Sequence, residues 1–264
     1  APIDAALPHG GLVAGALHEV TGAGADVALA AAAGLFAAGI MARLTGPVLW
    51  VLEQDDAFAP GLAGLKVPDG HGQGVSLTFD DGPSPRFTPV ILALLELAQV
   101  PATFFVIGRE AANYPQIVRQ AQTGGFEIGN HTWNHVMVPM APAVAAQEVK
   151  RTDVFLTDLL KKRPRFFRPP GGELNTGVAA YAHARGETVV TWSVDPRDYM
   201  RGITADRIVD VVLAQVQPGS VLLLHDGGGD RTATIDALNR LLPALRARGF
   251  TFVSLQRLCG LAHC

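Results

Sequence analysis

Two short segments of the sequence carry side chains that could hold a metal ion. Residues 78–85, TFDDGPSP, place two adjacent aspartates directly after an apolar stretch. Adjacent carboxylates repel each other unless a cation or a proton lies between them, although a turn could also use them to bond its own backbone. Residues 131–135, HTWNH, place histidines at i and i+4, which face the same way on a helix. We therefore predict that two imidazoles on a helix and one aspartate converge on a divalent cation.

Three further segments place polar residues after apolar stretches. They are FRPPGGELN at 167–175, WSVDPRDY at 192–199 and VLLLHDG at 221–227. In the first, proline fixes the backbone and glycine allows a substrate to approach a main-chain N–H group. Each segment alone also fits a structural role, such as a stiff loop or a histidine at the rim of the core. Five such segments, each after a predicted strand, favour one shared site.

These segments fall within a regular alternation of short apolar and amphipathic stretches. We predict strands at 75–79, 102–108, 126–130, 187–194, 220–226 and 250–255, and helices at 89–98, 115–123, 143–160, 176–185, 205–216 and 232–248. This rhythm is typical of an α/β fold with a parallel sheet, most naturally a barrel. In such barrels the functional side chains gather at the carboxyl ends of the strands. The predicted fold would therefore bring the five segments together.

Composition excludes several other classes of protein. Of the 264 residues, 48% are hydrophobic and 17% are charged, which suits a large folded core rather than a disordered chain. The net charge is −3, and we interpret the densest basic run, at 161–168, as a solvated helix end, so we expect no nucleic-acid partner. The apolar run at 27–44 is rich in alanine and glycine and is bounded by Asp26 and Arg43. We expect a buried helix there rather than a membrane segment.

The five segments, in this order, resemble the five motifs of the NodB-homology polysaccharide deacetylases, the family 4 carbohydrate esterases. The resemblance covers residues 74–258. It implies a distorted (β/α) barrel with fewer than eight regular strands and a divalent metal, most often zinc, with cobalt as a possible substitute. It also implies a glycan substrate, whose N-acetylglucosamine units lose their acetyl groups, as in chitin oligomers or peptidoglycan. An O-acetyl xylan esterase is a close alternative, because the same metal site attacks esters.

The resemblance also implies roles for particular residues. Asp81, His131 and His135 match the positions of the metal ligands. Asp80 matches the general base, which would take a proton from the attacking water. His225 matches the general acid, which would protonate the departing amine.

Further residues match supporting positions of the family. Arg168 would hold Asp80 ionised and oriented, and Asp198 would keep His225 charged, because a nearby anion favours imidazolium.

The remaining matches concern the substrate pocket. The backbone N–H of Gly171 would bind the oxyanion, and Leu223 would line the pocket for the acetyl methyl group. Trp192 and Tyr199 would add flat aromatic surface to the pocket. The family often has an aromatic residue where this chain has Gly171 and a tryptophan where it has Tyr199. These two departures put the substrate preference in doubt more than the activity.

Residues 1–66 lie outside this resemblance, and we predict that a linker at 67–74 joins them to a deacetylase domain at 75–264. Their predicted elements are a strand at 15–20, a helix at 26–44 and a strand at 47–52. This βαβ-like extension resembles part of a RecA-like protein of the ImuA type. Residues 22–26, GAGAD, lack the Gly-Lys-Ser/Thr ending of a phosphate-binding loop, so we expect no nucleotide hydrolysis. The extension could instead simply pack its helix against the barrel, or result from a fusion.

Other properties leave alternatives open. A non-catalytic glycan-binding module, or a RecA-like regulatory fusion, is the main alternative to an enzyme. No basic stretch followed by an apolar one begins the sequence, so no signal peptide is visible and a cytoplasmic location is favoured over secretion. Cys259 and Cys264 could pair, but so short a loop would constrain little of the chain. The sequence gives no indication of the oligomeric state.

Overall fold

The computed structural model describes residues 48–49 and 74–262, with side chains described for 74–259. The predicted strand at 15–20, the predicted helix at 26–44 and the turn at 22–26 lie outside the described residues, as does Cys264. The RecA-like resemblance and the pairing of the two cysteines therefore stay predictions.

The described part of the chain forms one sheet in which every pairing is parallel. The strands are β1 (Val48–Leu49), β2 (Gly74–Asp80), β3 (Ala102–Val106), β4 (Glu127–Asn130), β5 (Phe166–Phe167), β6 (Thr188–Val190), β7 (Val221–His225) and β8 (Thr251–Phe252). Their order is β1-β6-β5-β4-β3-β2-β7, and β8 pairs with the start of β2. The parallel α/β fold predicted from the sequence is confirmed. Because the strands are parallel, their carboxyl ends lie on the same side of the sheet.

The sheet curls into a distorted barrel. An isolated bridge joins Val194, which follows β6, to Leu222 in β7, and the backbone N–H of Leu223 donates to the Val194 carbonyl at 2.9 Å. These bonds connect the segment after β6 with the strand at the opposite edge of the sheet. At the other side of β6, Val48 of β1 pairs with Val189. This short strand lies within the predicted extension but is part of the same sheet.

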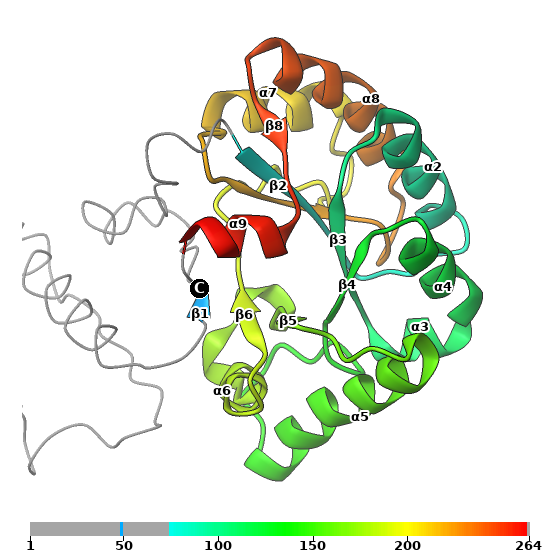
Figure 1. The fold of residues 1–264 in the computed structure, drawn as a ribbon, viewed down its shortest axis with the longest axis vertical. Coiled ribbons are helices and arrows are strands. Elements are labelled where there is room, and N and C mark those ends of the chain that lie inside the picture. The colour runs from blue at the N-terminus through cyan, green and yellow to red at the C-terminus, as the bar shows by residue number, and fades with distance from the viewer. Residues whose placement is uncertain (1–47, 50–73, 263–264) are drawn as a thin grey trace, which may run out of the picture. The chain divides into compact units, whose positions relative to one another are not determined.

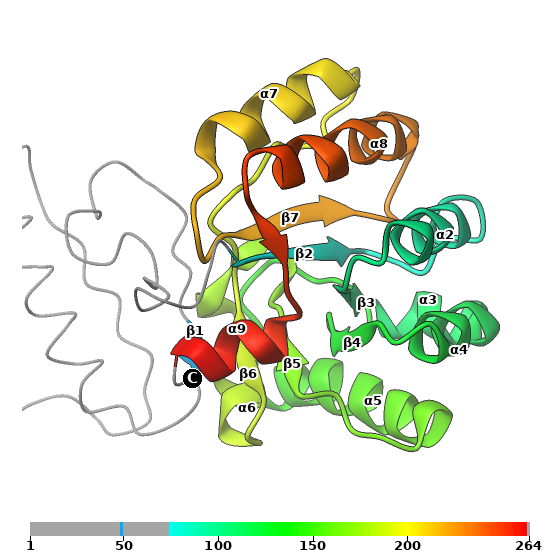
Figure 2. The same ribbon diagram turned by 45° about the horizontal axis from the view of Figure 1, so that its top comes forward.

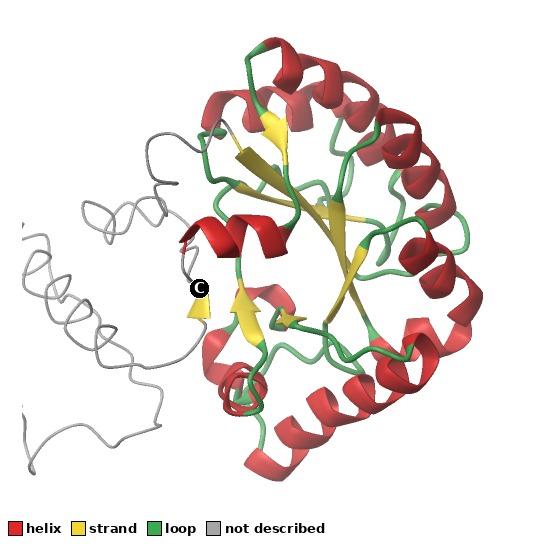
Figure 3. Cartoon of the chain, in the orientation of Figure 1, coloured by secondary structure: helices red, strands yellow, loops and turns green. Residues whose placement is uncertain are grey.

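Helices form an outer layer around the strands, except for the last one, which lies across the inside of this ring in the view of Figures 1 and 3. They are α2 (Thr88–Ala98), α3 (Gly108–Asn113), α4 (Pro115–Thr123), α5 (Pro142–Leu160), α6 (Val178–Ala184), α7 (Ala205–Gln215), α8 (Thr232–Ala247) and α9 (Leu255–Ala262). Two 3₁₀ turns, Pro170–Gly172 and Leu174–Thr176, follow β5. The six helices predicted between residues 89 and 248 are all present, with ends that differ by two residues at most, whereas α3 and α9 were not predicted. None of the helices in the described ranges combines the length and the apolarity needed to cross a membrane.

The core lies between the sheet and the helices. Every residue of β2 is buried, which suits a central strand of a parallel sheet covered on both faces. Phe104 of β3 stacks on Phe79 of β2 with ring centroids 5.1 Å apart, and its edge contacts Phe126 at 5.6 Å. Such aromatic pairs contribute beyond the area they bury. This aromatic cluster fixes β2 and β3 relative to each other, and β2 carries the first two predicted site residues at its end.

Truncation of this cluster should destabilise the fold strongly. Phe104 is only 1% exposed, so Phe104→Ala should lower the free energy of unfolding by about 3–5 kcal/mol through lost burial and a cavity. Urea unfolding followed by circular dichroism measures the change. The control is Leu97→Ala on α2, because Leu97 is 86% exposed and should change stability by less than about 0.5 kcal/mol. Equal effects of the two substitutions would contradict this description of the core.

Candidate active site

Several of the predicted site residues end a strand or directly follow one. Asp80 and His225 are the last residues of β2 and β7, and they are partners in the register of these two strands. His131 directly follows β4, and Arg168 directly follows β5. Figure 2 shows β2 and β7 side by side and pointing the same way. The parallel topology thus brings together residues that are far apart in the sequence.

Arg168 crosses the interior of the barrel and is fully buried. Its Nη1 donates to Oδ1 of Asp80 at 2.7 Å and to the hydroxyl of Thr78 at 2.8 Å. Its Nε donates to the Val190 carbonyl at 3.1 Å, and Nη2 donates to the Thr191 carbonyl at 3.0 Å. The guanidinium therefore joins β5 to β2 and to the end of β6, and it fixes one oxygen of Asp80. The predicted pairing of Arg168 with Asp80 is present.

Two opposing effects act on the carboxyl group of Asp80. Burial raises its pKa, whereas the charges of Arg168 and His225 and the hydrogen bond from Arg168 lower it. The net direction is upward, which makes Asp80 a stronger proton acceptor than an exposed aspartate. The cationic neighbours favour the ionised form that a base needs.

Asp81, His131 and His135 turn their ligand atoms toward one point. Oδ1 of Asp81 lies 3.2 Å from Nε2 of His135 and 3.6 Å from Nε2 of His131. One ligand atom from each residue lies within 4.8 Å of the others. Ligands about 2.0–2.1 Å from a tetrahedral zinc ion are separated by roughly 3.4 Å, so the two distances from Oδ1 of Asp81 suit such an ion.

The hydrogen bonding of this triad also fits a cation. Oδ1 of Asp81 is buried and accepts no hydrogen bond from the described part of the chain. Nδ1 of His131 lies 2.7 Å from the Arg168 carbonyl, which can only accept, so Nδ1 carries the proton and Nε2 offers its lone pair toward Asp81. Burial, and then the neighbouring His135, lower the pKa of His131 to about 3, so the ring is neutral as a metal ligand must be.

The prediction that the two histidines lie on a helix is wrong. Residues 131–135 form a loop in which Thr132 and His135 have left-handed backbone, with φ of 65° and 60°. The Thr132 hydroxyl accepts the backbone N–H of His135 at 3.1 Å. This local bond competes with a helical ladder, and the rings converge with centroids 4.9 Å apart through the loop geometry instead.

His225 is held by a buried carboxylate. Nδ1 of His225 lies 2.7 Å from Oδ1 of Asp198, and Oδ2 of Asp198 accepts the His225 backbone N–H at 2.9 Å and the Thr234 hydroxyl at 2.8 Å. Burial alone would lower the pKa of His225, but the hydrogen bond to Asp198 and its charge raise the pKa to about 9. A pKa of about 9 favours the protonated form of His225 at neutral pH, and its role as the acid stays a prediction.

The four predicted pocket residues lie in different surroundings. Gly171 lies in the 3₁₀ turn after β5 with a φ of 63°, and a Cβ there would come 3.0 Å from the sulfur of Met137. Leu223 and Trp192 are almost fully buried and belong to one apolar cluster. The ring of Tyr199 is half exposed, and its centroid lies 5.2 Å from that of His225. Tyr199 thus lies beside the predicted acid, while the pocket roles stay predictions.

Asp226 contributes to the site, although no role was predicted for it. Its Oδ2 accepts the Thr88 hydroxyl at 2.5 Å, and a Cβ on Gly82 would approach the same oxygen to 2.2 Å. Burial, together with the charges of Asp81 and Asp80, raises its pKa to about 7. Asp226 therefore supports the loop that carries Asp81. The sequence did indicate that Asp226 lies at the site, because it directly follows His225 and polar residues at the strand ends of a barrel face the site.

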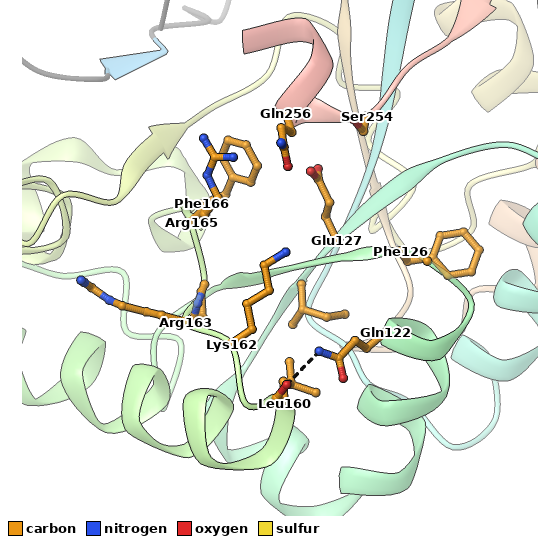
Figure 4. Close-up of a pocket in the computed structure, with 13 residues that line it drawn as sticks. Gln122, Phe126, Glu127, Leu160, Lys162, Arg163, Arg165, Phe166, Ser254 and Gln256 are labelled. Atoms are coloured by element: carbon orange, nitrogen blue, oxygen red, sulfur yellow. Dashed lines mark hydrogen bonds between the residues drawn. The ribbon is translucent and has the colours of Figure 1, made fainter. Parts of the chain in front are cut away.

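A separate hollow lies at the opposite end of the strands. It has a volume of about 400 Å³ and lies at the amino ends of β4 and β5, where Lys162 and Arg165 line it with Glu127 and Gln256 (Figure 4). Glu127 accepts the Thr103 hydroxyl at 2.9 Å. None of the predicted site residues lines this hollow.

Comparison with known proteins agrees with this geometry. The family model described as polysaccharide deacetylase matches residues 68–190. A peptidoglycan-N-acetylglucosamine deacetylase of Bacillus cereus is 38% identical over 196 residues, which cover 72% of this chain and 89% of that protein. A chitooligosaccharide deacetylase of Sinorhizobium fredii is 43% identical over 197 residues, covering 69% of this chain and 89% of that protein.

A solved structure extends the comparison to the fold. The crystal structure of a peptidoglycan N-acetylglucosamine deacetylase, bound to a naphthalenyl N-oxidanyl-benzamide, superposes with a TM-score of 0.68 at 37% identity. The superposition covers 71% of this chain and 88% of that chain. Both the sequence identity and the curled parallel sheet are therefore shared with enzymes of one kind, and the chain belongs to the polysaccharide deacetylase family.

Proposed function

We propose that this protein is a metal-dependent hydrolase that removes N-acetyl groups from N-acetylglucosamine-containing oligosaccharides or polysaccharides and releases acetate. The observation that carries the proposal is the convergence of three ligand atoms of Asp81, His131 and His135 beside an arginine-bound carboxylate and a protonated histidine. Relatives named for peptidoglycan and for chitooligosaccharides support this class of substrate.

Asp81, His131 and His135 would hold the cation. Two imidazoles and one carboxylate are ligands that zinc accepts, and Co²⁺ takes similar sets. A divalent cation at this point would supply Lewis acidity and would lower the pKa of a water molecule from about 15.7 toward roughly 7.

Asp80 and His225 divide the proton transfers. Asp80 accepts a proton from the water as the water oxygen forms a bond with the acetyl carbon. His225 donates its Nε2 proton to the amide nitrogen as the carbon–nitrogen bond breaks, because Nδ1 is engaged with Asp198. The products are acetate and the free amine of the sugar. Arg168 keeps the base ionised and oriented throughout.

The turn after β5 supplies a donor for the developing negative charge. Gly171 lies at the surface of this turn, and in the proposed mechanism its backbone N–H donates to the oxyanion of the tetrahedral intermediate. The left-handed φ of Gly171 favours glycine at this position, and the absence of a side chain lets the substrate approach the backbone.

Removal of the metal and removal of the base should each abolish activity. Chelated protein should release almost no acetate from N-acetylglucosamine oligomers, and added Zn²⁺ or Co²⁺ should restore release. Asp80→Asn leaves the three ligands intact, so it should still bind zinc but release acetate at least about 10²-fold more slowly. The matched control is Asp236→Asn, an exposed acid on α8, which should keep full activity.

The same assay distinguishes the alternatives. Release from acetylxylan, but not from the amino-sugar oligomers or peptidoglycan, would replace the N-deacetylase proposal with an O-acetyl esterase. No release from any of these substrates by zinc-loaded protein would contradict the enzymatic proposal.

The alkaline limit of activity should depend on Asp198. His225 must be protonated to donate, so kcat/KM should fall as the pH rises through its pKa of about 9. Asp198→Asn removes the anion that raises this pKa, so the alkaline limb should move to lower pH. The pH profile of kcat/KM measures the shift, and Asp210→Asn, an exposed acid on α7, serves as control. An alkaline limb unchanged by Asp198→Asn would show that His225 is not the acid.

A further inference from the structure

Glu148 of α5 binds the backbone of the loop that carries the two histidines. Its Oε2 accepts the backbone N–H of Trp133 at 3.1 Å and that of Asn134 at 2.7 Å. Its Oε1 accepts the side-chain amide of Asn134 at 2.6 Å. These three bonds fall on the two residues midway between His131 and His135.

The loop N–H groups are the donors that compensate the buried carboxylate of Glu148. It is only 7% exposed, and burial of a carboxylate is unfavourable unless donors compensate it. Among the described residues, no ion pair joins Glu148 to a lysine, arginine or histidine. The donors that stabilise its charge are the N–H groups of the loop, so helix and loop fix each other.

The opposite side of the loop is held as well. The backbone N–H groups of Gly108 and Arg109, at the start of α3, donate to the carbonyls of Thr132 at 2.8 Å and Trp133 at 3.2 Å. The ring of Trp133 packs against α5, with the Arg151 guanidinium 3.8 Å from its centroid. The loop is therefore clamped between α3, which binds its carbonyls, and α5, which binds its N–H groups.

The start of the loop depends on α5 through a second carboxylate. Asp153 accepts the side-chain amide of Asn130 at 2.8 Å, and the Asn130 amide oxygen accepts the backbone N–H of Thr132 at 2.8 Å. Asn130 and Asp153 are buried. Glu148 thus acts on the middle of the loop, where Asp153 does not reach.

The loop needs these external bonds because of its backbone. Thr132 and His135 both have positive φ, a conformation that costs non-glycine residues about 1–3 kcal/mol each unless the surroundings hold it. The same conformation turns Nε2 of both histidines toward Asp81. Loss of the bonds to Trp133 and Asn134 would let the two residues relax, and His135 would leave the ligand position.

We propose that Glu148 is a positioning residue of the metal centre, which sets the affinity for the divalent cation by fixing the loop between the two histidine ligands. This inference rests on the metal site of the proposed function. Partners that orient metal ligands change metal affinity by about 10–100-fold when they are removed.

Zinc binding to the full-length apoprotein tests this role without any glycan. Glu148→Ala should raise the dissociation constant for Zn²⁺ about 10–100-fold, measured by calorimetry with a competing chelator. It should also alter the visible absorption spectrum of bound Co²⁺, which reports the geometry of the ligands. Asp158→Ala removes an exposed acid from the same helix and should leave both readouts unchanged.

Glu148→Gln distinguishes the effect of the hydrogen bonds on zinc affinity from the effects of the negative charge and of overall stability. The glutamine oxygen can accept both backbone N–H groups, and the Asn134 amide can turn to accept from the glutamine NH₂. Glu148→Gln should therefore bind Zn²⁺ nearly as tightly as the parent and restore its Co²⁺ spectrum.

Several outcomes would overturn the inference. Parental affinity and an unchanged spectrum in Glu148→Ala would show that the loop needs no clamp, and equal weakening by Gln and Ala would assign the effect to charge. If Glu148→Ala does not fold, Glu148→Asp keeps the charge but shortens the reach, and parental zinc affinity in that variant would also overturn it. Failure of the proposed function is distinct, since the parent protein would then bind zinc yet release no acetate.

Discussion

The ion pair between Arg168 and Asp80 is the interaction on which the site depends most directly. Both partners are buried in the barrel, where an unpaired charge is strongly destabilising, and loss of one partner typically costs about 3–5 kcal/mol. Arg168 also donates to carbonyls at the end of β6, and its own carbonyl binds Nδ1 of His131. One residue therefore orients the proposed base, selects the tautomer of a proposed metal ligand and connects three strands of the sheet.

Two adjacent carboxylates have different partners because the backbone turns between them. Asp80 ends β2 and points into the barrel at Arg168, whereas Asp81 has a φ of 71° and presents Oδ1 to the histidines. The turn is tight against the segment after β7, because a Cβ on Gly227 would overlap the Asp81 carbonyl at 2.1 Å. Only glycine allows the two backbone segments to approach so closely, and that approach keeps His225 at the end of β7 next to Asp80 at the end of β2.

The sequence was sufficient for features that depend on local pattern and on topology. The alternation of strands and helices predicted the parallel sheet, and parallel strands necessarily collect the residues that follow them. The conformation of residues 131–135 was not predictable from spacing, because it depends on Glu148, which is 13 residues beyond His135, and on the start of α3. The helical spacing did indicate that Glu148 is buried. It adjoins Val149 and lies between Ala145 and Thr152, and all four residues share the buried side of α5. The pairing of β1 with β6 could not be predicted either. It joins residues about 140 positions apart through backbone hydrogen bonds, which no side-chain pattern in the sequence indicates.

The charge balance at the carboxyl end of the barrel gives an independent reason for a cation there. Asp80, Asp81, Asp198 and Asp226 lie close together, and Asp195, which accepts the Arg197 backbone N–H and the Tyr199 hydroxyl, lies near Asp198. Arg168 compensates Asp80, protonated His225 compensates Asp198, and a pKa of about 7 leaves Asp226 partly neutral. Arg231 bonds the carbonyls of Gly227 and Asp198 rather than a carboxylate. Asp81 faces the imidazoles of His131 and His135, and no lysine or arginine among the described residues forms an ion pair with it. A divalent ion would supply positive charge at the point where Asp81, His131 and His135 direct their ligand atoms, so the same ion would balance the charge of the site and activate water.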